Sequence, residues 1–527
     1  MANSGESSIV ALALTTAASR IMGLFRDMVI FMLLGISQWS GAFLFAFTVP
    51  NLFRRLLGEG ALASAMIPVY GEALAAGNIA ETHRFFNGVL SRLSVLLCAA
   101  VGLVSLVIFT AWPLLNAHWM RAFGLCILLF PYLPCASISA LFCGALNVHN
   151  SFALPAFTAT LLNLSIIGGG LCAIIFFQNL PFHGTLLLCF GVLGGGFLQV
   201  LFPWILLRRT GWRFHWNWVA DDRIARISRL FTPAVMGAAI VQINAAISRT
   251  LAYCFTANGL PLLYISSRLV ELPIGIFMAS IASVAFPQLT RKALQDDERG
   301  FFYQYYRAQW SVLMIAIPCT MGLVALGRPI LQLLFQRGNF SADSVVQAVP
   351  ILAVSAIGIP FYSIHSIATR AFHARQDMKT PLRIALWTVA LNFLGTLLSL
   401  KLWGTLGIVL ANGSTALLQC LWLHGRLRQM FVPKNQWHRT LRFHCLPLCI
   451  SSLLLALALY GSHCIGGMKI FQSLAKLNAC IELFSAISTG AIAYIVPLYL
   501  FRFPEVSLLT AFFKIFAPSS VAKKAGD

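Results

Sequence analysis

The stretch VLLCAAVGLVSLVIFTA at residues 95–111 contains no charged side chain and is a clear guide to the fold. With its apolar flanks it is long enough to cross a bilayer, because a helix of about 20 residues spans about 30 Å of hydrocarbon. The chain has 527 residues, of which 59% are hydrophobic and 10% charged, and its mean hydropathy is +0.81. Soluble domains carry about 25% charged residues. We therefore expect an all-α polytopic membrane protein, since helices satisfy their own backbone hydrogen bonds in lipid.

Similar apolar runs recur along the whole chain, with short polar connections between them. They predict about fourteen transmembrane helices, near residues 8–34, 41–70, 86–112, 122–146, 155–177, 185–207, 230–256, 262–288, 308–335, 346–370, 382–400, 405–425, 443–462 and 483–501. The second and the eighth runs are interrupted by charged residues. This pattern indicates that both line a cavity and do not face lipid.

The sequence also contains a weak internal repeat. The segment LASAMIPVY at 62–70 resembles IASVAFPQL at 281–289, and two looser pairs of segments follow in the same order at similar spacing. Each half holds an even number of runs, which predicts two lobes with parallel orientation. We expect an N-terminal lobe at 1–210, a basic cytoplasmic linker at 211–229, a C-terminal lobe at 230–428, two further helices at 443–502 and a cytoplasmic tail at 503–527.

Basic residues gather on one side of the predicted membrane. If the N-terminus is cytoplasmic, the cytoplasmic connections carry the arginines and lysines of 208–229, 291–307, 370–383 and 426–442, and the opposite side carries few. The positive-inside rule therefore places both termini in the cytoplasm. This bias explains most of the net charge of +21, and without a contiguous basic face no nucleic acid is expected as a partner.

The cysteines and histidines do not predict a metal or a disulfide. The 13 cysteines are scattered, mostly within apolar runs and without a CxxC pair, and no histidine cluster has the spacing of metal ligands. We expect the cysteines to be small core residues in a reduced setting, and we expect no metal.

The motif SRIMGLFRD at 19–27 places two arginines in the first apolar run. An arginine at mid-membrane depth costs about 2.5–3.5 kcal/mol on insertion scales, so it needs a partner or a wet cavity. Arg20 and Arg26 lie about 120° apart around a helix, and Asp27 can neutralise one of them. Two interpretations remain open. Either Arg26 and Asp27 end a helix at the membrane surface, or at least one arginine faces a cavity.

The second, interrupted run contains PNLFRRLLGEG at 50–60. Its proline and glycines permit a bend, and a pair of guanidinium groups can grip a diphosphate through bidentate hydrogen bonds. We expect Arg54 to face a substrate, and we expect Glu59 to pair with either Arg54 or Arg55.

The eighth run contains a comparable motif, SSRLVELP at 266–273. Arg268 and Glu271 are three residues apart, so they lie on one helix face and are able to pair. The pair is either a salt bridge that lets both residues enter the membrane, or a cavity-lining arginine held by Glu271. Its position in the internal repeat favours the second interpretation.

The surplus of arginines over acids in these runs predicts an anionic ligand in a hydrated cavity. A pocket for cationic drugs should be rich in acids, which is the opposite charge. An enzyme acting on polyprenyl phosphates would need metal-binding carboxylates, and Asp221 and Asp222 followed by Arg223 do not form a DDxxD motif. A structural scaffold would leave the intramembrane arginines without a role.

These motifs closely resemble those of the MurJ (MviN) family. The likeness extends over essentially the whole chain and rests on SRIMGLFRD at 19–27, PNLFRRLLGEGALASAMIP at 50–68, SSRLVELPIGIF at 266–277, LFQRGNF at 334–340 and ARQDMKTP at 374–381. The resemblance implies a lipid II flippase of the multidrug/oligosaccharidyl-lipid/polysaccharide exporter superfamily. It also implies fourteen helices in two lobes, with the helix pair at 443–502 forming a groove for a polyprenyl tail.

The same resemblance implies the residues of the binding site. Four arginines match the cavity arginines on which members depend, and Glu59 matches the acid of the family's RR-x-x-x-EG pattern. The expected diphosphate-binding residues are Arg20, Arg26, Arg54 and Arg268, supported by Asp27, Arg55, Glu59 and Glu271.

Some positions depart from the family pattern. Gly41 and Thr48 stand where many members have an aspartate and a lysine, so those two polar contacts are not expected here. Some members bind sodium through acids on the seventh helix, where this chain offers Gln242, Asn244 and Ser248. A sodium site is therefore not expected, and the membrane potential or another ion gradient is expected to drive transport without a cofactor.

The resemblance further implies the substrate and its setting. We expect a monomer in a bacterial inner membrane that moves undecaprenyl-diphosphate-linked disaccharide-pentapeptide, lipid II, from the cytoplasmic to the outer leaflet by alternating access. Membrane lipids are expected contacts, and peptidoglycan synthases are candidate partners. The alternative is an exporter of another polyprenyl-linked glycan or of a drug in the same superfamily.

Overall fold

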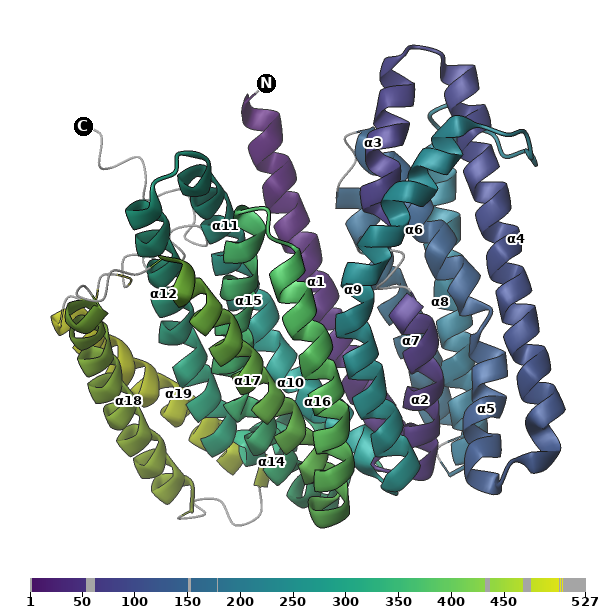
Figure 1. Ribbon diagram of the computed structural model, residues 1–527. Helices are drawn as coiled ribbons and strands as arrows, with labels where there is room; N and C mark the ends of the chain where they lie inside the picture. Colours follow the sequence, from purple (N-terminus) through teal and green to yellow (C-terminus); the bar gives the residue numbers. More distant parts are fainter. Residues whose placement is uncertain are drawn as a thin grey trace. The chain divides into compact units, whose positions relative to one another are not determined.

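Every regular element in the described part of the chain is a helix (Figure 1). The computed structural model describes residues 2–53, 62–149, 153–177, 179–431, 437–467, 475–501, 503 and 505. The helices are α1 (Ala2–Leu34), α2 (Gln38–Phe53), α3 (Leu62–Ala75), α4 (Ile79–Ala111), α5 (Ala117–Leu129), α6 (Tyr132–Val148), α7 (Ala153–Phe177), α8 (Pro181–Arg208), α9 (Asp222–Phe255), α10 (Gly259–Pro273), α11 (Ala279–Leu294), α12 (Glu298–Ala325), α13 (Gly327–Phe335), α14 (Ala342–Ile357), α15 (Ile359–Ala374), α16 (Lys379–Trp403), α17 (Thr405–Phe431), α18 (Trp437–Gly467) and α19 (Ala475–Leu500). A short 3-10 helix (η2) occupies Trp112–Leu114, and a π-helix (η3) occupies Ile274–Met278.

The helices agree with the apolar runs of the sequence. Among the described residues, 11 helical segments are long and apolar enough to cross a membrane. The remaining expected spans fall on α1, on α2 with α3, and on α9. The predicted fold class, an all-helical polytopic membrane protein, is confirmed.

Prolines explain why several predicted runs are divided into two helices. Pro131 caps the start of α6, so the run at 122–146 becomes α5 and α6. Pro360 occupies the first turn of α15, which begins at Ile359 directly after Gly358. In the eighth run, Pro273 ends α10 and the π-helix follows. Proline removes a backbone donor from the helix, and π-helical turns are frequent at functional sites.

The chain divides into two compact units. Unit 1 comprises Met1–Leu262 and Phe335–Ser344, and unit 2 comprises Leu263–Leu334 and Val345–Asp527. The segment 335–344 thus belongs to unit 1, although the chain on both sides of it belongs to unit 2. The lobe boundaries inferred from the internal repeat remain predictions.

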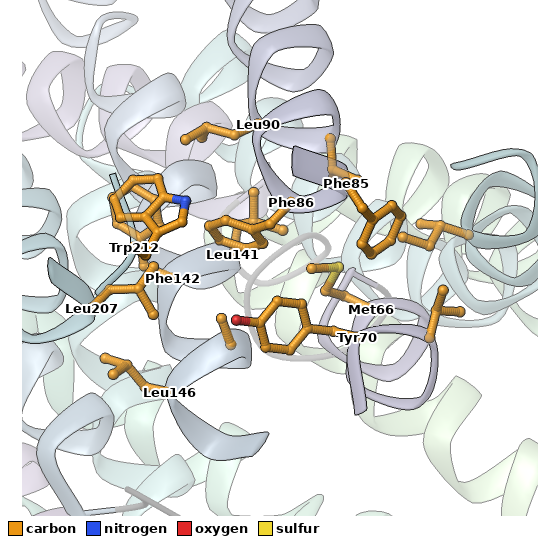
Figure 2. Packing of buried hydrophobic residues seen from close by; sticks show 14 of the residues in the cluster. Met66, Tyr70, Phe85, Phe86, Leu90, Leu141, Phe142, Leu146, Leu207 and Trp212 are labelled. Carbon is orange, nitrogen blue, oxygen red and sulfur yellow. The ribbon is translucent and has the colours of Figure 1, made fainter. Parts of the chain in front are cut away.

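The core of unit 1 is built around large aromatic side chains (Figure 2). The fully buried ring of Phe86 in α4 lies with its centroid 5.5 Å from that of Tyr70 in α3 and 6.2 Å from that of Phe142 in α6. Trp212 follows α8, is only 1% exposed, and packs its ring 5.6 Å from Phe86. The buried indole therefore fixes the start of the connection between α8 and α9 to the helical core.

The segment 335–344 packs on the C-terminal end of α1. The ring of Phe31 lies 5.9 Å from that of Phe335 and 6.1 Å from that of Phe340, both edge to face. The backbone N–H of Asn339 donates to the carbonyl oxygen of Met32 at 2.9 Å. The side-chain amide of Asn339 donates to the carbonyl oxygen of Leu33. These bonds satisfy carbonyls that the end of a helix leaves without intrahelical partners.

Unit 2 has a core that joins the last two helices to α12. Leu448 and Leu455 of α18 and Leu498 of α19 are buried together with Met314 of α12. The hydroxyl of Tyr494 donates to the carbonyl oxygen of Met314 at 2.9 Å. The pair α18 and α19 is therefore an integral part of unit 2.

Candidate functional site

Arg26 is buried in unit 1 and held by two side chains. Its Nε and Nη2 donate to Oδ1 of Asp27 at 3.0 and 2.7 Å, and its Nη1 donates to Oδ1 of Asn163 at 3.1 Å. The side chains of Arg26 and Asp27 are 9% and 1% exposed. Asn163 belongs to α7 and donates in turn to the carbonyl oxygen of Ser19 at 3.1 Å. A buried charge is stable only when it is paired and hydrogen-bonded, and this network supplies both conditions.

The position of this pair decides one question that the sequence left open. Helix α1 continues to Leu34, well past Asp27. The interpretation that Arg26 and Asp27 end a helix at the membrane surface is therefore wrong. The expectation that Asp27 neutralises one arginine is confirmed, and Arg26 is the arginine concerned.

Arg20 lies on the same helix but in different surroundings. Its side chain is exposed, and it makes no ion pair with the residues that the structure describes. The sequence placed Arg20 and Arg26 on different faces of the helix. In the structure the guanidinium of Arg20 is accessible and that of Arg26 is buried. Of the two, Arg20 is the one that a ligand from solvent reaches without displacing a partner.

The motif with Arg54, Arg55 and Glu59 falls outside the described residues, between the end of α2 at Phe53 and the start of α3 at Leu62. The described part of the motif confirms that proline enters a helix here, because Pro50 lies inside α2 and is buried.

Arg268 is half-buried on α10 in unit 2. Its Nη1 lies 3.2 Å from Oε2 of Glu271, and its guanidinium carbon stands 5.8 Å from the ring centroid of Tyr264. The side chains of Arg268 and Glu271 are 28% and 42% exposed. The π-helix begins directly after Pro273, within the same membrane-spanning segment, Gly259–Met278. The predicted pairing of Arg268 with Glu271 is confirmed, and neither side chain is fully buried.

Two polar partners escaped the sequence analysis. Asn163 lies 137 residues from Arg26, so no local pattern connects them; its only signal is an amide in the otherwise apolar run LLNLSIIGGG at 161–170. Tyr264 precedes Arg268 by one helical turn, so the i, i+4 spacing could have indicated its place under the guanidinium.

The accessible arginines suit an anionic ligand. A guanidinium presents a planar fork of donors that matches phosphate oxygens bidentately. Arg20 is exposed, and Arg268 retains an exposed part beside Glu271. The donors of Arg26 are already engaged by Asp27 and Asn163, and its charge is neutralised by Asp27.

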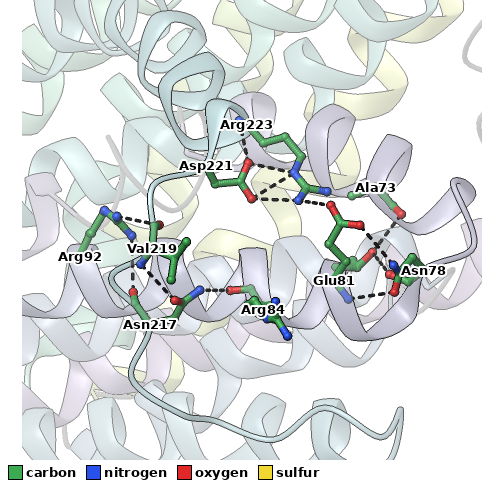
Figure 3. Close-up of polar contacts among 10 residues, drawn as sticks. Ala73, Asn78, Glu81, Arg84, Arg92, Asn217, Val219, Asp221 and Arg223 are labelled. Carbon is green, nitrogen blue, oxygen red and sulfur yellow. Dashed lines mark hydrogen bonds and ion pairs between the residues drawn. The ribbon is translucent and has the colours of Figure 1, made fainter.

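A cavity of about 490 Å³ lies elsewhere in unit 1, between the first turns of α4 and the connection before α9. Of the arginines predicted for the substrate, the three that the structure describes, Arg20, Arg26 and Arg268, do not line it. Its charges are balanced, because Nη2 of Arg223 lies 2.7 Å from Glu81 and 2.9 Å from Asp221 (Figure 3). The hydrogen bond from Arg223 lowers the pKa of Asp221 below its ordinary value. This cavity offers no surplus of positive charge to a diphosphate.

Comparison with known proteins yields a consistent result. The family model described as "Lipid II flippase MurJ" matches residues 30–479. A protein of Vibrio cholerae named "Probable lipid II flippase MurJ" is 31% identical over 441 residues, which cover 80% of this chain and 82% of that protein.

Two solved structures share the fold. One, titled "Lipid II flippase MurJ, inward closed conformation", has a TM-score of 0.73 at 22% identity and covers 92% of this chain and 99% of its own. The other is titled as an inward-facing conformation of a multidrug resistance MATE family transporter of the MOP superfamily. It has a TM-score of 0.62 at 13% identity and covers 79% of this chain and 98% of its own. At these identities the two structures support the fold alone.

Proposed function

This chain belongs to the family of the lipid II flippase MurJ, and from that premise we propose that it moves lipid II from the cytoplasmic to the outer leaflet of a bacterial inner membrane. The family consists of membrane transporters in peptidoglycan biosynthesis, so the chain is a transporter and not an enzyme. The lipid it would carry is an undecaprenyl diphosphate bearing a disaccharide-pentapeptide.

The main support for this substrate is Arg268. It lies in a membrane-spanning segment, yet 28% of its side chain is exposed beside Glu271. An accessible guanidinium at such a place is costly in lipid and suits a hydrated path for an anion. The positive charge also argues against a cationic drug as the substrate.

We propose that the diphosphate binds to Arg20, Arg54 and Arg268, whereas Arg26, paired with Asp27, supports the site by linking α1 to α7. Arg20 and Arg268 are accessible, whereas the guanidinium of Arg26 is held by Asp27 and Asn163. Asp27 and Glu271 then act as supporting residues that limit the net charge of the empty site. Arg55 and Glu59 would act in the same way for Arg54.

The polyprenyl tail is assigned to α18 and α19. These helices pack on each other and on α12, and they present exposed apolar side chains, among them Leu453 (62%), Leu457 (59%), Phe484 (77%) and Ile487 (57%). Such a surface suits a long hydrocarbon chain, because the tail remains in an apolar environment while the head group moves. We further propose that both termini are cytoplasmic, since the basic connections then follow the positive-inside rule.

Alternating access of two lobes, driven by the membrane potential or an ion gradient, would complete the cycle. A ligand shifts such an equilibrium only by its different affinity for the two states. A diphosphate that binds one state more tightly than the other would supply that difference.

The test uses the full-length chain in liposomes that contain fluorescently labelled lipid II. We expect the labelled head group to become accessible on the opposite face, and we expect Arg268→Ala to abolish this transfer. Arg291→Ala is the matched control, because Arg291 is an exposed arginine at the end of α11 and outside the proposed site. Transfer equal to that of protein-free liposomes under every imposed ion gradient would overturn the proposal. Transfer of another undecaprenyl-diphosphate glycan in place of lipid II would favour the alternative exporter.

A further inference from the structure

An aromatic ladder occupies the non-helical connection between α8 and α9. It consists of Trp212, Phe214, Trp216 and Trp218, which alternate along an extended chain and so lie on one side of it. Successive ring centroids are 6.5, 5.2 and 6.4 Å apart, and the last two indoles are parallel within 1°. The innermost ring, Trp212, is buried, whereas Phe214, Trp216 and Trp218 are 41%, 59% and 55% exposed.

The exposed rings are held in place by α4. Nη2 of Arg92 donates to the carbonyl oxygen of Val219 at 3.0 Å (Figure 3). The same atom donates to the carbonyl oxygen of Trp218 at 2.8 Å. The amide of Asn217 donates to the carbonyl oxygen of Arg84 at 2.7 Å. At the buried end, Nε1 of Trp212 donates to Oδ1 of Asn87 at 2.9 Å. A flexible loop would fold its aromatic rings inward, whereas these bonds to the backbone keep three of them exposed.

The ladder lies where the polar and apolar parts of α4 meet. Its contacts on α4 fall between Arg84 and Arg92. The next turns of the helix expose apolar side chains in a continuous run, including Leu96 (66%), Leu103 (63%) and Phe109 (72%). This run belongs to the candidate membrane-spanning segment Ile79–Leu114, whose apolar 18-residue window is only 11% buried inside the protein, as expected for a surface that faces lipid. The ladder is therefore continuous with the lipid-facing surface, at the depth where a bilayer changes from hydrocarbon to head groups.

The charge of the connection agrees with this depth. Between residues 208 and 219 the chain has three arginines, Arg208, Arg209 and Arg213, and no acid, and all three are exposed. Tryptophan is enriched at membrane interfaces, and basic residues near an anionic leaflet gain about 1 kcal/mol each, which corresponds to about fivefold in affinity.

We infer that the aromatic ladder is a binding surface for anionic phospholipid, which seats Phe214, Trp216 and Trp218 among the head groups and pairs the three arginines with lipid phosphates. The connection between the two halves of the chain is then attached to the bilayer.

The first test locates the indole of Trp216 in the full-length chain. The protein and its Trp216→Phe variant are reconstituted in vesicles of phosphatidylcholine and phosphatidylglycerol, with or without lipids brominated near the head-group end of the acyl chain. Trp216 makes ring contacts only with Phe214 and Trp218 among the described residues, so its loss should leave the fold intact. The difference in fluorescence between the protein and the variant reports Trp216. We expect this difference to be quenched by the brominated lipid and to be protected from aqueous iodide. Quenching by iodide and not by bromine would overturn the inference.

The second test addresses the charge. Binding of spin-labelled phosphatidylglycerol, relative to spin-labelled phosphatidylcholine, is compared between the protein and Arg209→Gln, Arg213→Gln and Arg291→Gln variants. Arg209→Gln and Arg213→Gln should each lower the preference for phosphatidylglycerol by about fivefold, whereas Arg291→Gln leaves it unchanged. An equal change in all three variants would show a general charge effect and contradict a site at the ladder.

Discussion

The backbone N–H of Asn339 donates to the carbonyl oxygen of Met32 at 2.9 Å, across 307 positions of the chain. This bond brings the turn of the LFQRGNF motif onto the end of α1. The contact requires a glycine on each of the two segments that it joins. Gly35 and Gly338 have φ values of +58° and +56°, which side chains rarely adopt. A Cβ on Gly35 would overlap the carbonyl oxygen of Asn339, and a Cβ on Gly338 would overlap that of Met32.

Gly338→Ala should therefore destabilise unit 1. We expect a loss of about 1–3 kcal/mol from backbone strain, and more because the carbonyl of Met32 must move. Thermal unfolding of the purified protein in detergent measures the effect. Gly404→Ala is the control, since Gly404 has a similar φ of +55° and open space around it. Equal unfolding temperatures for the two variants would show that the close packing on α1 contributes nothing.

Replacement of Arg26 and of Arg20 should separate stability from transport. Arg26→Gln removes a buried charge that pairs with the carboxylate of Asp27, and breaking a buried pair typically costs about 3–5 kcal/mol. Arg20→Gln changes an exposed side chain and should leave the unfolding temperature within error while it slows lipid II transfer. Unfolding in detergent and transfer in liposomes provide the two measurements. A stable Arg26→Gln variant would refute the structural role assigned to the buried pair.

The ring of Tyr264 should matter to transport through its contact with Arg268. Tyr264→Phe keeps an aromatic face under the guanidinium, whereas Tyr264→Leu removes it. A cation–π contact contributes about 0.5–1 kcal/mol at an exposed site, so Tyr264→Leu should reduce the transfer rate about two- to fivefold and Tyr264→Phe should not. The same comparison in an Arg268→Lys background gives a double-mutant cycle. Additive effects in that cycle would disconnect the ring from the guanidinium.

The connection between α8 and α9 should loosen in acid. Asp221 caps α9 and accepts hydrogen bonds from Arg223, which lowers the pKa of its carboxyl group. A group with a lowered pKa in the folded state stabilises above its unfolded pKa, near 3.8, and this contribution disappears as the pH falls through the folded value. Indole fluorescence between pH 6 and pH 2, measured on the protein and on Asp221→Asn, follows the change.

In this titration the Asp221→Asn variant should lack the low-pH step. Asp222→Asn serves as the control, because Asp222 is exposed and makes no ion pair within the described part of the chain. If both variants keep the step, another group controls it.

The sequence predicted the features of this fold that local chemistry determines. Apolar runs located the helices, as in α8, which spans Pro181–Arg208 where the run at 185–207 predicted it. The pair of Arg268 and Glu271 followed from the helical repeat, because residues three apart share a face.

Contacts between distant segments could not be predicted in this way. Asn163 meets Arg26 because α7 packs on α1, and Trp212 is buried because α4 and α6 leave space for it. The extended ladder after α8 also escaped prediction. In the sequence, its alternating aromatic residues look like part of an ordinary basic linker. The hydrogen bonds with α4 are what show that the rings are held in place.

The membership of residues 335–344 in unit 1 has a consequence for biogenesis. Phe31 emerges from the ribosome early, but the rings of Phe335 and Phe340 that cover it are synthesised only after most of the helices of unit 1 and several of unit 2. During that interval the end of α1 lacks these two contacts. The packing of α1 is therefore completed late in synthesis, and a nascent chain arrested before residue 335 should be a preferred target for membrane quality-control proteases.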